Sequence, residues 1–243
     1  MSYLHAAEIS AGAAAVAGLT VGGWFYASRW PASRLFGEAL TAPQRPGELA
    51  LTFDDGPNPA WTPQLLELLG QHDIRATFFL LGRFAQTAPE LVQRIAAAGH
   101  LIGNHTWSHP HLSSTPAAQI REELVRTNAA LEHITGAKVE YFRPPFGARR
   151  PAVFRIARKL GLRPVLWNAM TSDWSEPSAD RIAERLGAKV DHFTRSGHAV
   201  NIVLHDGGHR ALGTNREPSV TAAEKLIVRY KKTHRFVRLD AWA

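Results

Sequence analysis

Residues 48–57, with the sequence ELALTFDDGP, form the stretch from which the fold can be worked out. They begin as a short apolar strand and end in two adjacent carboxylates, Asp54 and Asp55. A helix is expected over residues 63–71, where leucines supply an apolar face, and a second buried strand over residues 76–82. Strand, helix and strand in this order predict a parallel βαβ unit.

The same alternation continues along the chain at spacings of roughly 25–35 residues. Further strands are expected at residues 100–103, 141–142, 164–167, 199–204 and 235–239. Further helices are expected at residues 89–98, 116–135, 152–160, 179–190 and 220–231. About seven strands with six or seven helices predict an α/β barrel or a wound sheet. In both architectures the active-site groups gather at the carboxyl ends of the strands.

The composition limits the chemistry that the chain can perform. It has 243 residues, no Cys, 12 His, and 28 Lys or Arg against 21 Asp or Glu, which gives a formal charge of +7. A hydrophobic content of 45% fits a folded globular protein. The lack of Cys excludes a disulfide scaffold, a Cys-type zinc finger, an iron–sulfur cluster and a Cys nucleophile. Because the basic residues are scattered, a solvated basic surface is favoured over a nucleic-acid partner.

The N-terminus differs from the rest of the chain. Residues 9–28 carry no charged side chain over 20 positions, a length that could span a bilayer, and aromatic residues cluster near the end of this segment. Three interpretations stay open: a membrane anchor, which we favour, a signal peptide, and a soluble packed helix. Arg29 and Arg34 follow the segment and, by the positive-inside rule, would place the remainder of the chain in the cytoplasm.

A second change in composition follows this segment. Residues 31–47 are rich in Pro, Ala, Gly and Arg and predict a linker, and regular strand–helix alternation starts at Glu48. We therefore expect an N-terminal hydrophobic segment over residues 1–30, a linker over residues 31–47 and one catalytic domain over residues 48–243.

Ionisable side chains follow five of the expected strands, at the point where each strand ends. They are Asp54 and Asp55, His105 and His109, Arg143, Asp173, and His205 with Asp206. The carboxyl ends of parallel strands meet at one edge, so we expect these groups to surround a single site. Helix caps and surface charges would instead be spread over both ends of the strands.

Two of these groups have the spacing of metal ligands. His105 and His109 stand four residues apart, which would place both imidazoles on one face of a helix and let them bind one ion. Asp55 or Asp54 could add a carboxylate, completing a site with open positions that suits a catalytic metal. The other carboxylate could act as general base on a metal-activated water, and His205 as general acid.

Five motifs resemble, in order, those of the polysaccharide deacetylases, the NodB-homology domains of carbohydrate esterase family four. They are Thr52-Phe-Asp-Asp-Gly-Pro57, His105-Thr-Trp-Ser-His109-Pro110, Arg143-Pro-Pro-Phe-Gly147, Asp173-Trp174 and Leu204-His205-Asp206. The resemblance covers residues 48–242, nearly everything after the expected linker, and five motifs in this order are very specific.

The resemblance implies a distorted (β/α)7 barrel. It implies removal of N-acetyl groups from N-acetylglucosamine polymers, of peptidoglycan or chitin type, with a divalent ion: zinc first, cobalt or nickel as alternatives. Carried over by motif, Asp54 would be the base and Arg143 would orient it. Asp55, His105 and His109 would be the metal ligands.

The remaining roles follow from the same resemblance. The backbone N–H of Phe146, together with the metal, would face the tetrahedral oxyanion. Trp174 would form the wall of the acetyl pocket with Val203 beside it, and His205 would protonate the leaving amine.

One motif departs from the family pattern. The fourth motif usually has the form Asp-x-x-Asp-Trp, and its first Asp supports the acid histidine by opposite charge. Here Met170 occupies that position, ahead of Asp173. We therefore expect His205 to be less basic than usual unless Asp206 or Glu176 substitutes.

Other functions remain open at this point. An O-acetyl esterase acting on xylan, or a hydrolase of small cyclic amides, would use the same site, and a catalytically silent glycan-binding domain would keep the fold. We favour the N-deacetylase, at the cell envelope or the extracellular side, where a basic protein suits an anionic surface. His111 and His209 lie near the motifs and could line the substrate groove.

Overall fold

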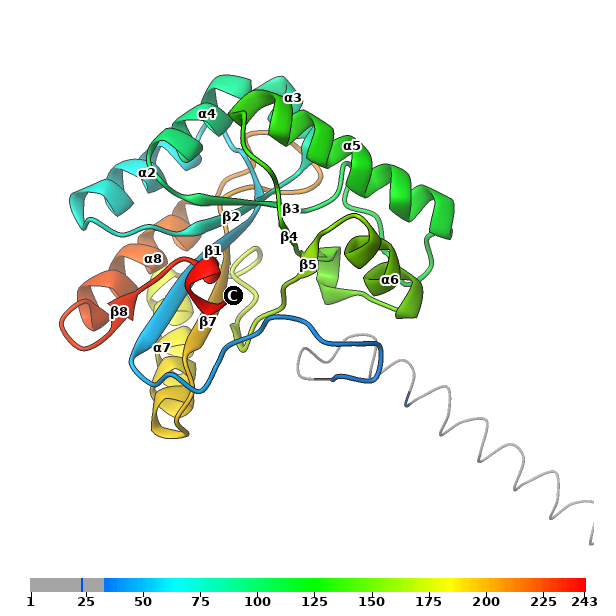
Figure 1. The fold of residues 1–243 in the computed structure, drawn as a ribbon. Helices are drawn as coiled ribbons and strands as arrows, with labels where there is room; N and C mark the ends of the chain where they lie inside the picture. The colour runs from blue at the N-terminus through cyan, green and yellow to red at the C-terminus, as the bar shows by residue number, and fades with distance from the viewer. Residues whose placement is uncertain (1–22, 24–32) are drawn as a thin grey trace, which may run out of the picture.

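A curled parallel sheet forms the centre of the computed structural model, which describes residue 23 and residues 33–243 (Figure 1). In chain order its strands are β1 (Glu48–Gly56), β2 (Thr77–Leu80), β3 (Leu101–Asn104), β4 (Tyr141–Phe142), β5 (Arg163–Pro164), β6 (Ala169–Met170), β7 (Val200–His205) and β8 (Arg235–Phe236). Their spatial order is β5-β4-β3-β2-β1-β7-β6, and β8 pairs with the start of β1. The α/β class and the parallel sheet expected from the sequence are confirmed.

Strand β1 lies inside the sheet, hydrogen-bonded to β2 on one side and to β7 on the other. All of its residues after Glu48 are buried. Parallel strands covered on both faces consist of nearly continuous apolar side chains, which is the character of residues 49–53. The one polar residue among these, Thr52, donates its hydroxyl hydrogen to the carbonyl of Ile202, 2.6 Å away.

Helices cover the outside of the curled sheet (Figure 1). They are α2 (Thr62–Gln71), α3 (Gly82–Thr87), α4 (Pro89–Ala97), α5 (Ala117–Thr135), α6 (Pro151–Lys159), α7 (Ala179–Arg195) and α8 (Glu217–Tyr230). Two short 3₁₀ turns, η1 (Pro145–Gly147) and η2 (Leu239–Trp242), complete the described part.

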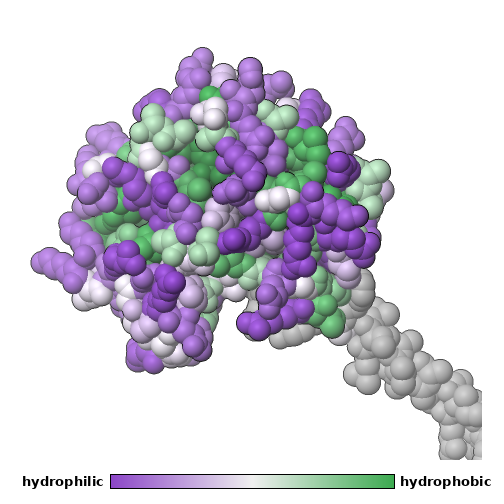
Figure 2. All heavy atoms as spheres, in the orientation of Figure 1, coloured by the Kyte–Doolittle hydropathy of each residue, from purple (hydrophilic) through white to green (hydrophobic). Residues whose placement is uncertain are grey.

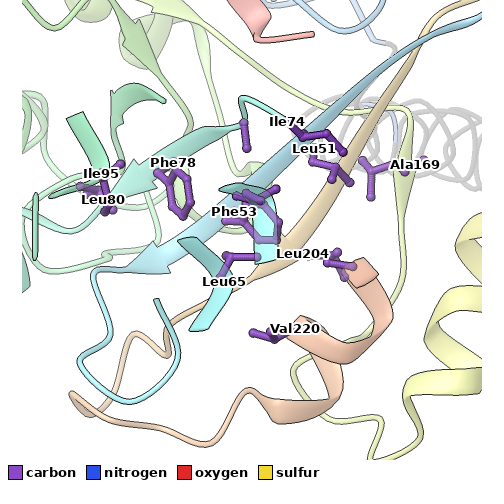
Figure 3. Packing of buried hydrophobic residues seen from close by; sticks show 14 of the residues in the cluster. Leu51, Phe53, Leu65, Ile74, Phe78, Leu80, Ile95, Ala169, Leu204 and Val220 are labelled. Atoms are coloured by element: carbon purple, nitrogen blue, oxygen red, sulfur yellow. The ribbon is translucent and has the colours of Figure 1, made fainter. Parts of the chain in front are cut away.

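The main hydrophobic core lies between the sheet and these helices (Figure 3). Leu65 of α2 and Val220 of α8 approach Phe53 of β1 and Leu204 of β7, and all four belong to one buried cluster. The ring of Phe53 stacks on that of Phe78 from β2, with centroids 5.3 Å apart. Each fully buried side chain of this size contributes roughly 1.5–3 kcal/mol, so the core fixes β1 and its neighbours in place.

The prediction of a single strand over residues 164–167 is wrong. Two short strands, β5 and β6, stand there instead, at opposite ends of the sheet order. Between them the N–H of Leu166 donates to the carbonyl of Leu40 (2.8 Å), and the N–H of Leu40 donates to the carbonyl of Pro164 (2.9 Å). A segment of the expected linker therefore takes the place of a neighbouring strand, and the described residues form no direct pairing between β5 and β6.

Two other boundaries differ from the sequence prediction. The strand expected over residues 76–82 ends at Leu80, and the unexpected helix α3 begins at Gly82. A Cβ added at Gly82 would lie 2.5 Å from the Trp107 ring, so this close approach requires glycine. The last expected strand, residues 235–239, is paired over only its first two residues.

The predicted N-terminal hydrophobic segment, residues 1–30, lies outside the described residues apart from Gly23. Within the described ranges, no helix has the length and apolar character that crossing a membrane requires. Part of the expected linker packs on the domain, because Phe36 is buried and Leu40 forms an isolated parallel bridge with Val165.

The surface seen in the orientation of Figure 1 is mostly hydrophilic, with hydrophobic areas separated by polar residues (Figure 2). Among the described residues, the large hydrophobic side chains that stay exposed are Leu35, Val125, Phe146, Trp174, Leu212 and Val228. Phe146 follows β4 and Trp174 follows β6. Both therefore lie beyond the carboxyl ends of strands, where the ionisable residues were expected to gather.

Replacing Phe78 with Ala should lower the free energy of unfolding by about 3–5 kcal/mol, because it removes a buried ring and leaves a cavity beside Phe53. Urea denaturation monitored by circular dichroism measures this loss. The matched control, Val228→Ala on the exposed face of α8, should change it by less than about 0.5 kcal/mol. Equal losses in the two variants would contradict the packing described here.

Candidate active site

Five of the eight ionisable residues expected at the strand ends line one pocket of about 270 Å³, and Arg143 and Asp173 each contact one of the five from outside the lining, whereas Asp206 contacts Thr62 instead. Asp54 at the end of β1 lies in register with His205 at the end of β7. Of the nine residues predicted for the site, eight line the pocket, and the ninth, Arg143, contacts Asp54 from the protein interior. The lining residues are Asp54, Asp55, His105, His109, Pro144, Phe146, Trp167, Met170, Trp174, Val203, His205, His209 and Arg216.

A bulge at the end of β1 turns both carboxylates toward this pocket. Successive side chains of a regular strand point to opposite faces. The register with β2 shifts between Asp54 and Gly56, and Asp55 adopts a left-handed φ of 69°. This conformation is uncommon for a residue with a side chain, and it lets two adjacent carboxylates reach the same edge of the sheet.

Asp55, His105 and His109 form a group that could hold a metal ion, with ligand atoms that all lie within 4.8 Å of one another. Asp55 Oδ1 lies 3.2 Å from His109 Nε2 and 3.5 Å from His105 Nε2. All three residues are buried, and Asp55 Oδ1 has no hydrogen-bond partner. Two imidazoles and one carboxylate suit zinc or a similar divalent ion and leave positions open, so the residues fit a catalytic metal.

Each imidazole of this group presents Nε2 to the carboxylate. His105 Nδ1 lies 2.8 Å from the carbonyl oxygen of Arg143, which places the ring proton on Nδ1 and leaves Nε2 free as a ligand. Burial lowers the pKa of His109 to about 3, and the neighbouring histidines add to this effect. Burial alone would raise the pKa of Asp55, but the surrounding histidines, first among them His209, hold it well below its ordinary value. A neutral imidazole beside a carboxylate anion is the protonation state that binds metal.

His105 and His109 do not share a helical face, and that part of the sequence prediction is wrong. They lie in a loop after β3, where His109 has a φ of 66°. The Glu123 carboxylate of α5 accepts hydrogen bonds from the backbone N–H groups of Trp107 and Ser108, both at 2.8 Å, and from the Ser108 hydroxyl at 2.7 Å. This buried carboxylate holds the loop in a shape that still brings both Nε2 atoms to Asp55.

Asp54 is held by a fully buried arginine. Arg143 Nη1 donates to Asp54 Oδ1 (2.8 Å) and to the Thr52 hydroxyl (2.7 Å), and Nη2 donates to Asn201 Oδ1 (3.4 Å). The other Asp54 oxygen, Oδ2, lies 3.9 Å from His105 Nε2. One carboxylate oxygen is thus fixed by the guanidinium while the other faces the metal-ligand group.

His205 has a carboxylate partner, and it is Asp173. His205 Nδ1 lies 2.9 Å from Asp173 Oδ1, and its backbone N–H donates to Asp173 Oδ2 at 2.8 Å. The Ser219 hydroxyl also donates to Oδ2. Although burial lowers the pKa of His205, Asp173 raises it to about 9. The expectation that Met170 leaves this histidine less basic is therefore wrong.

Neither carboxylate suggested as a substitute takes this role. Asp206 accepts a hydrogen bond from the hydroxyl of Thr62, and burial raises its pKa to about 7. Glu176 lies 3.4 Å from Arg185 of α7. Sequence spacing could not distinguish these candidates, because the choice depends on which loop folds back onto the end of β7.

Aromatic rings form the walls of the pocket. Phe146, with a φ of 56° in the turn after β4, is 52% exposed, and its ring lies edge-on to His109 with centroids 4.5 Å apart. Trp174 is 46% exposed and lies edge-on to His205 at 5.2 Å. Val203 is buried in a small cluster with Trp167. These surfaces are apolar and partly open, as a pocket for a small acyl group requires.

Five lining residues were given no role by the sequence analysis, although His209 was named there as a residue that could line the groove. They are Pro144, Trp167, Met170, His209 and Arg216. A signal existed for His209, which ends a Gly-Gly-His run just after the fifth motif, and for Pro144, which lies inside the third motif. No local pattern marks Arg216, which reaches the pocket only because the loop after β7 returns to the start of α8.

Comparison with known proteins agrees with this geometry. The family model for polysaccharide deacetylase matches residues 41–165. The chain belongs to the polysaccharide deacetylase family. A peptidoglycan-N-acetylglucosamine deacetylase of Bacillus cereus is 36% identical over 204 residues, which cover 84% of this chain and 70% of the relative. A chitooligosaccharide deacetylase of Azorhizobium caulinodans is 37% identical over 71% of this chain and 80% of its own length.

Solved structures of members of this family are also similar to this chain. A crystal structure of a peptidoglycan N-acetylglucosamine deacetylase matches with a TM-score of 0.74 and 36% identity, covering 84% of this chain and 91% of that chain. A pseudoenzyme of carbohydrate esterase family four from Bacillus anthracis also matches, with a TM-score of 0.74 and 25% identity, over 84% of this chain and 68% of its own. Likeness of fold therefore does not separate active from inactive members, and the side chains of the site must do so.

Replacing Asp173 with Asn should lower the pKa of His205 from about 9 toward its ordinary value of 6.5, because the largest charge that opposes the effect of burial is removed. Nuclear magnetic resonance titration of the imidazole signals measures this change. The control, Glu176→Gln, should leave the pKa of His205 near 9. The reverse pattern would contradict the pairing.

The pairing of His205 with Asp173 also predicts in which direction the stability of the fold changes with pH. Because folding raises the pKa of His205, its contribution is fully present below pH 6.5 and is lost as the pH rises through about 9. The difference in free energy of unfolding between the native chain and Asp173→Asn should therefore be largest in mildly acidic buffer and shrink toward pH 9. Chemical denaturation at several pH values measures it, and a difference that grows with pH would contradict the assignment.

Proposed function

We propose that this chain is a metal-dependent deacetylase that hydrolyses the N-acetyl groups of N-acetylglucosamine residues in a polysaccharide. One observation carries the proposal: a single pocket contains an arginine-held carboxylate, a metal-ligand group and a charged imidazole acid. Water adds to the acetyl carbonyl carbon and the C–N bond breaks, so the products are acetate and a free amine on the sugar.

Asp54 is the general base in this proposal. Its Oδ1 is fixed by Arg143, which leaves Oδ2 on the pocket side to take a proton from the attacking water. Asp55, His105 and His109 would hold the divalent ion, zinc first and cobalt or nickel as alternatives. When bound, such an ion polarises the acetyl carbonyl and lowers the pKa of water to roughly 7.

His205 is the general acid. Its Nδ1 faces Asp173, so Nε2 is the atom that can reach the leaving nitrogen, and a pKa of about 9 keeps the ring protonated at neutral pH. The backbone N–H of Phe146 would face the developing oxyanion. Trp174 and Val203 would enclose the acetyl methyl group, since their apolar surfaces line the pocket.

The charged His205 favours an amide substrate over an ester. An amine leaves only after it is protonated, whereas a sugar alkoxide needs less assistance, so an acid with a raised pKa suits N-deacetylation.

O-acetyl xylan esterase and cyclic-amide hydrolase activities use the same groups and remain the second candidates. The complete set of base, ligands and acid argues against a silent glycan-binding domain.

The polymer is of peptidoglycan or chitin type, since named relatives act on peptidoglycan N-acetylglucosamine and on chitooligosaccharides.

We place the enzyme at the cell envelope or the extracellular side, associated with the membrane through residues 9–28. The basic net charge supports this placement, because it suits an anionic surface. We also assign the curled sheet to the distorted (β/α)7 barrel type.

The direct test is acetate release from chitooligosaccharides, peptidoglycan and acetylated xylan. We expect release from an N-acetylated glycan, its loss after treatment with a chelator, and its return on addition of zinc. Release from acetylated xylan alone would support the esterase instead. Glycan binding with no release from any substrate would leave only a binding domain.

Asp54→Asn should reduce kcat by roughly 10²–10⁴-fold, because the amide cannot accept the proton from water. Bound zinc, measured by elemental analysis, should stay at the native level, since Asp55 and the two histidines remain. The matched control is Asp180→Asn at the start of α7, an exposed carboxylate that does not line the pocket, which should keep full activity. An Asp54→Asn enzyme that retains turnover would contradict the assigned base.

A further inference from the structure

The pocket contains a fourth histidine that the roles above do not use. We propose that His209 is a positioning residue for the metal-binding carboxylate, holding the Asp55 oxygen that faces away from the ligand histidines. The inference rests on the proposed metal site but adds to it a group from a different loop, the segment between β7 and α8.

The two oxygens of Asp55 face different partners. Oδ1 lies 3.2 Å from His109 Nε2 and 3.5 Å from His105 Nε2, whereas Oδ2 lies 3.7 Å from His209 Nδ1. A carboxylate that binds an ion through one oxygen can still rotate unless its second oxygen is restrained. Ligating carboxylates in metal sites are restrained in this way by hydrogen bonds from outside the ligand set. His209 Nδ1 is the group that faces Oδ2.

Ring stacking fixes the orientation of His209 and excludes it as a fourth ligand in this arrangement. Its ring lies nearly parallel to that of His109, with centroids 4.3 Å apart and 14° between the planes. An imidazole binds metal in the plane of its ring, so two stacked parallel rings do not point at one ion. The ring of Phe146 lies edge-on to both rings, 5.7 Å from His209 and 4.5 Å from His109, so the three rings pack as one group. The side chain is 34% exposed, enough to be replaced without opening the core.

The backbone around His209 is anchored at several points. Arg83 of α3 donates a hydrogen bond to the His209 carbonyl. Arg216 Nε donates to the carbonyl of Gly207 (2.6 Å), and Asn58 Nδ2 donates to the carbonyl of Thr214 (2.8 Å). The loop is therefore tied to α3, to the start of α8 and to the turn after β1.

The Gly-Gly-His run has a physical reason in this arrangement. A Cβ on Gly207 would lie 2.0 Å from the carbonyl oxygen of Asp55, so the loop crosses directly over the backbone of the ligand residue. A Cβ on Gly208 would lie 2.7 Å from the side chain of Thr214. Only residues without side chains allow this approach, and the approach is what brings His209 to the Asp55 carboxylate.

The experiment measures zinc affinity by competition with a chromophoric chelator, in the absence of substrate. His209→Ala should weaken zinc binding about 10–100-fold, the usual effect of removing such a group. His209→Asn should restore most of the lost affinity, because its amide N–H can take the place of Nδ1–H. In cobalt-loaded protein, the visible absorption spectrum should shift in His209→Ala and return toward the native spectrum in His209→Asn.

The matched control is His111→Ala, which removes a histidine from the same group of rings. His111 stacks on Phe146 with centroids 5.3 Å apart and is not part of the Asp55, His105 and His109 group that could hold the ion, so zinc affinity should not change. Native affinity in His209→Ala, an equal loss in His111→Ala, or no recovery in His209→Asn would each overturn the proposal. The readout needs no substrate, so an enzyme that binds zinc as expected but releases no acetate would refute the proposed function alone.

Discussion

Two adjacent carboxylates are buried at the end of β1, and the surrounding residues of the site offset the free-energy cost of burying them. An unpaired ionised carboxylate in the protein interior is strongly destabilised. The guanidinium of Arg143, which is fully buried, offsets the charge of Asp54, and nearby histidines, first among them His209, lower the pKa of Asp55. Each carboxylate has its own partners, so the two anions can stand side by side and take different chemical roles.

Arg143, which offsets the charge of Asp54, also joins distant parts of the chain. Arg143 enters from the end of β4 and also binds Thr52 of β1 and Asn201 of β7, so it connects strands that are far apart in the sequence. The same residue offers its carbonyl oxygen to His105 Nδ1. One buried arginine therefore orients a carboxylate with its side chain and a ligand imidazole with its backbone.

The pocket holds two of its histidines in different charge states. Asp173 holds a positive charge on His205 at one side, while burial and neighbouring histidines keep His109 neutral at the other. Both are imidazoles with the same ordinary pKa, so the difference arises entirely from surroundings. The proposed proton donor and a proposed metal ligand can thus line one small pocket.

The sequence determined the α/β class, the edge of the sheet that carries the chemistry, and the side chains gathered there. It could do so because apolar runs and the ionisable groups that follow them are local patterns. Tertiary structure decided what depends on contacts between distant segments. Asp173, not Asp206 or Glu176, supports His205 because of how the loop after β6 folds, and Glu123 of α5 shapes the histidine loop from within an ordinary amphipathic helix. The sequence spacing of those carboxylates carries no information about which backbone or imidazole they will meet.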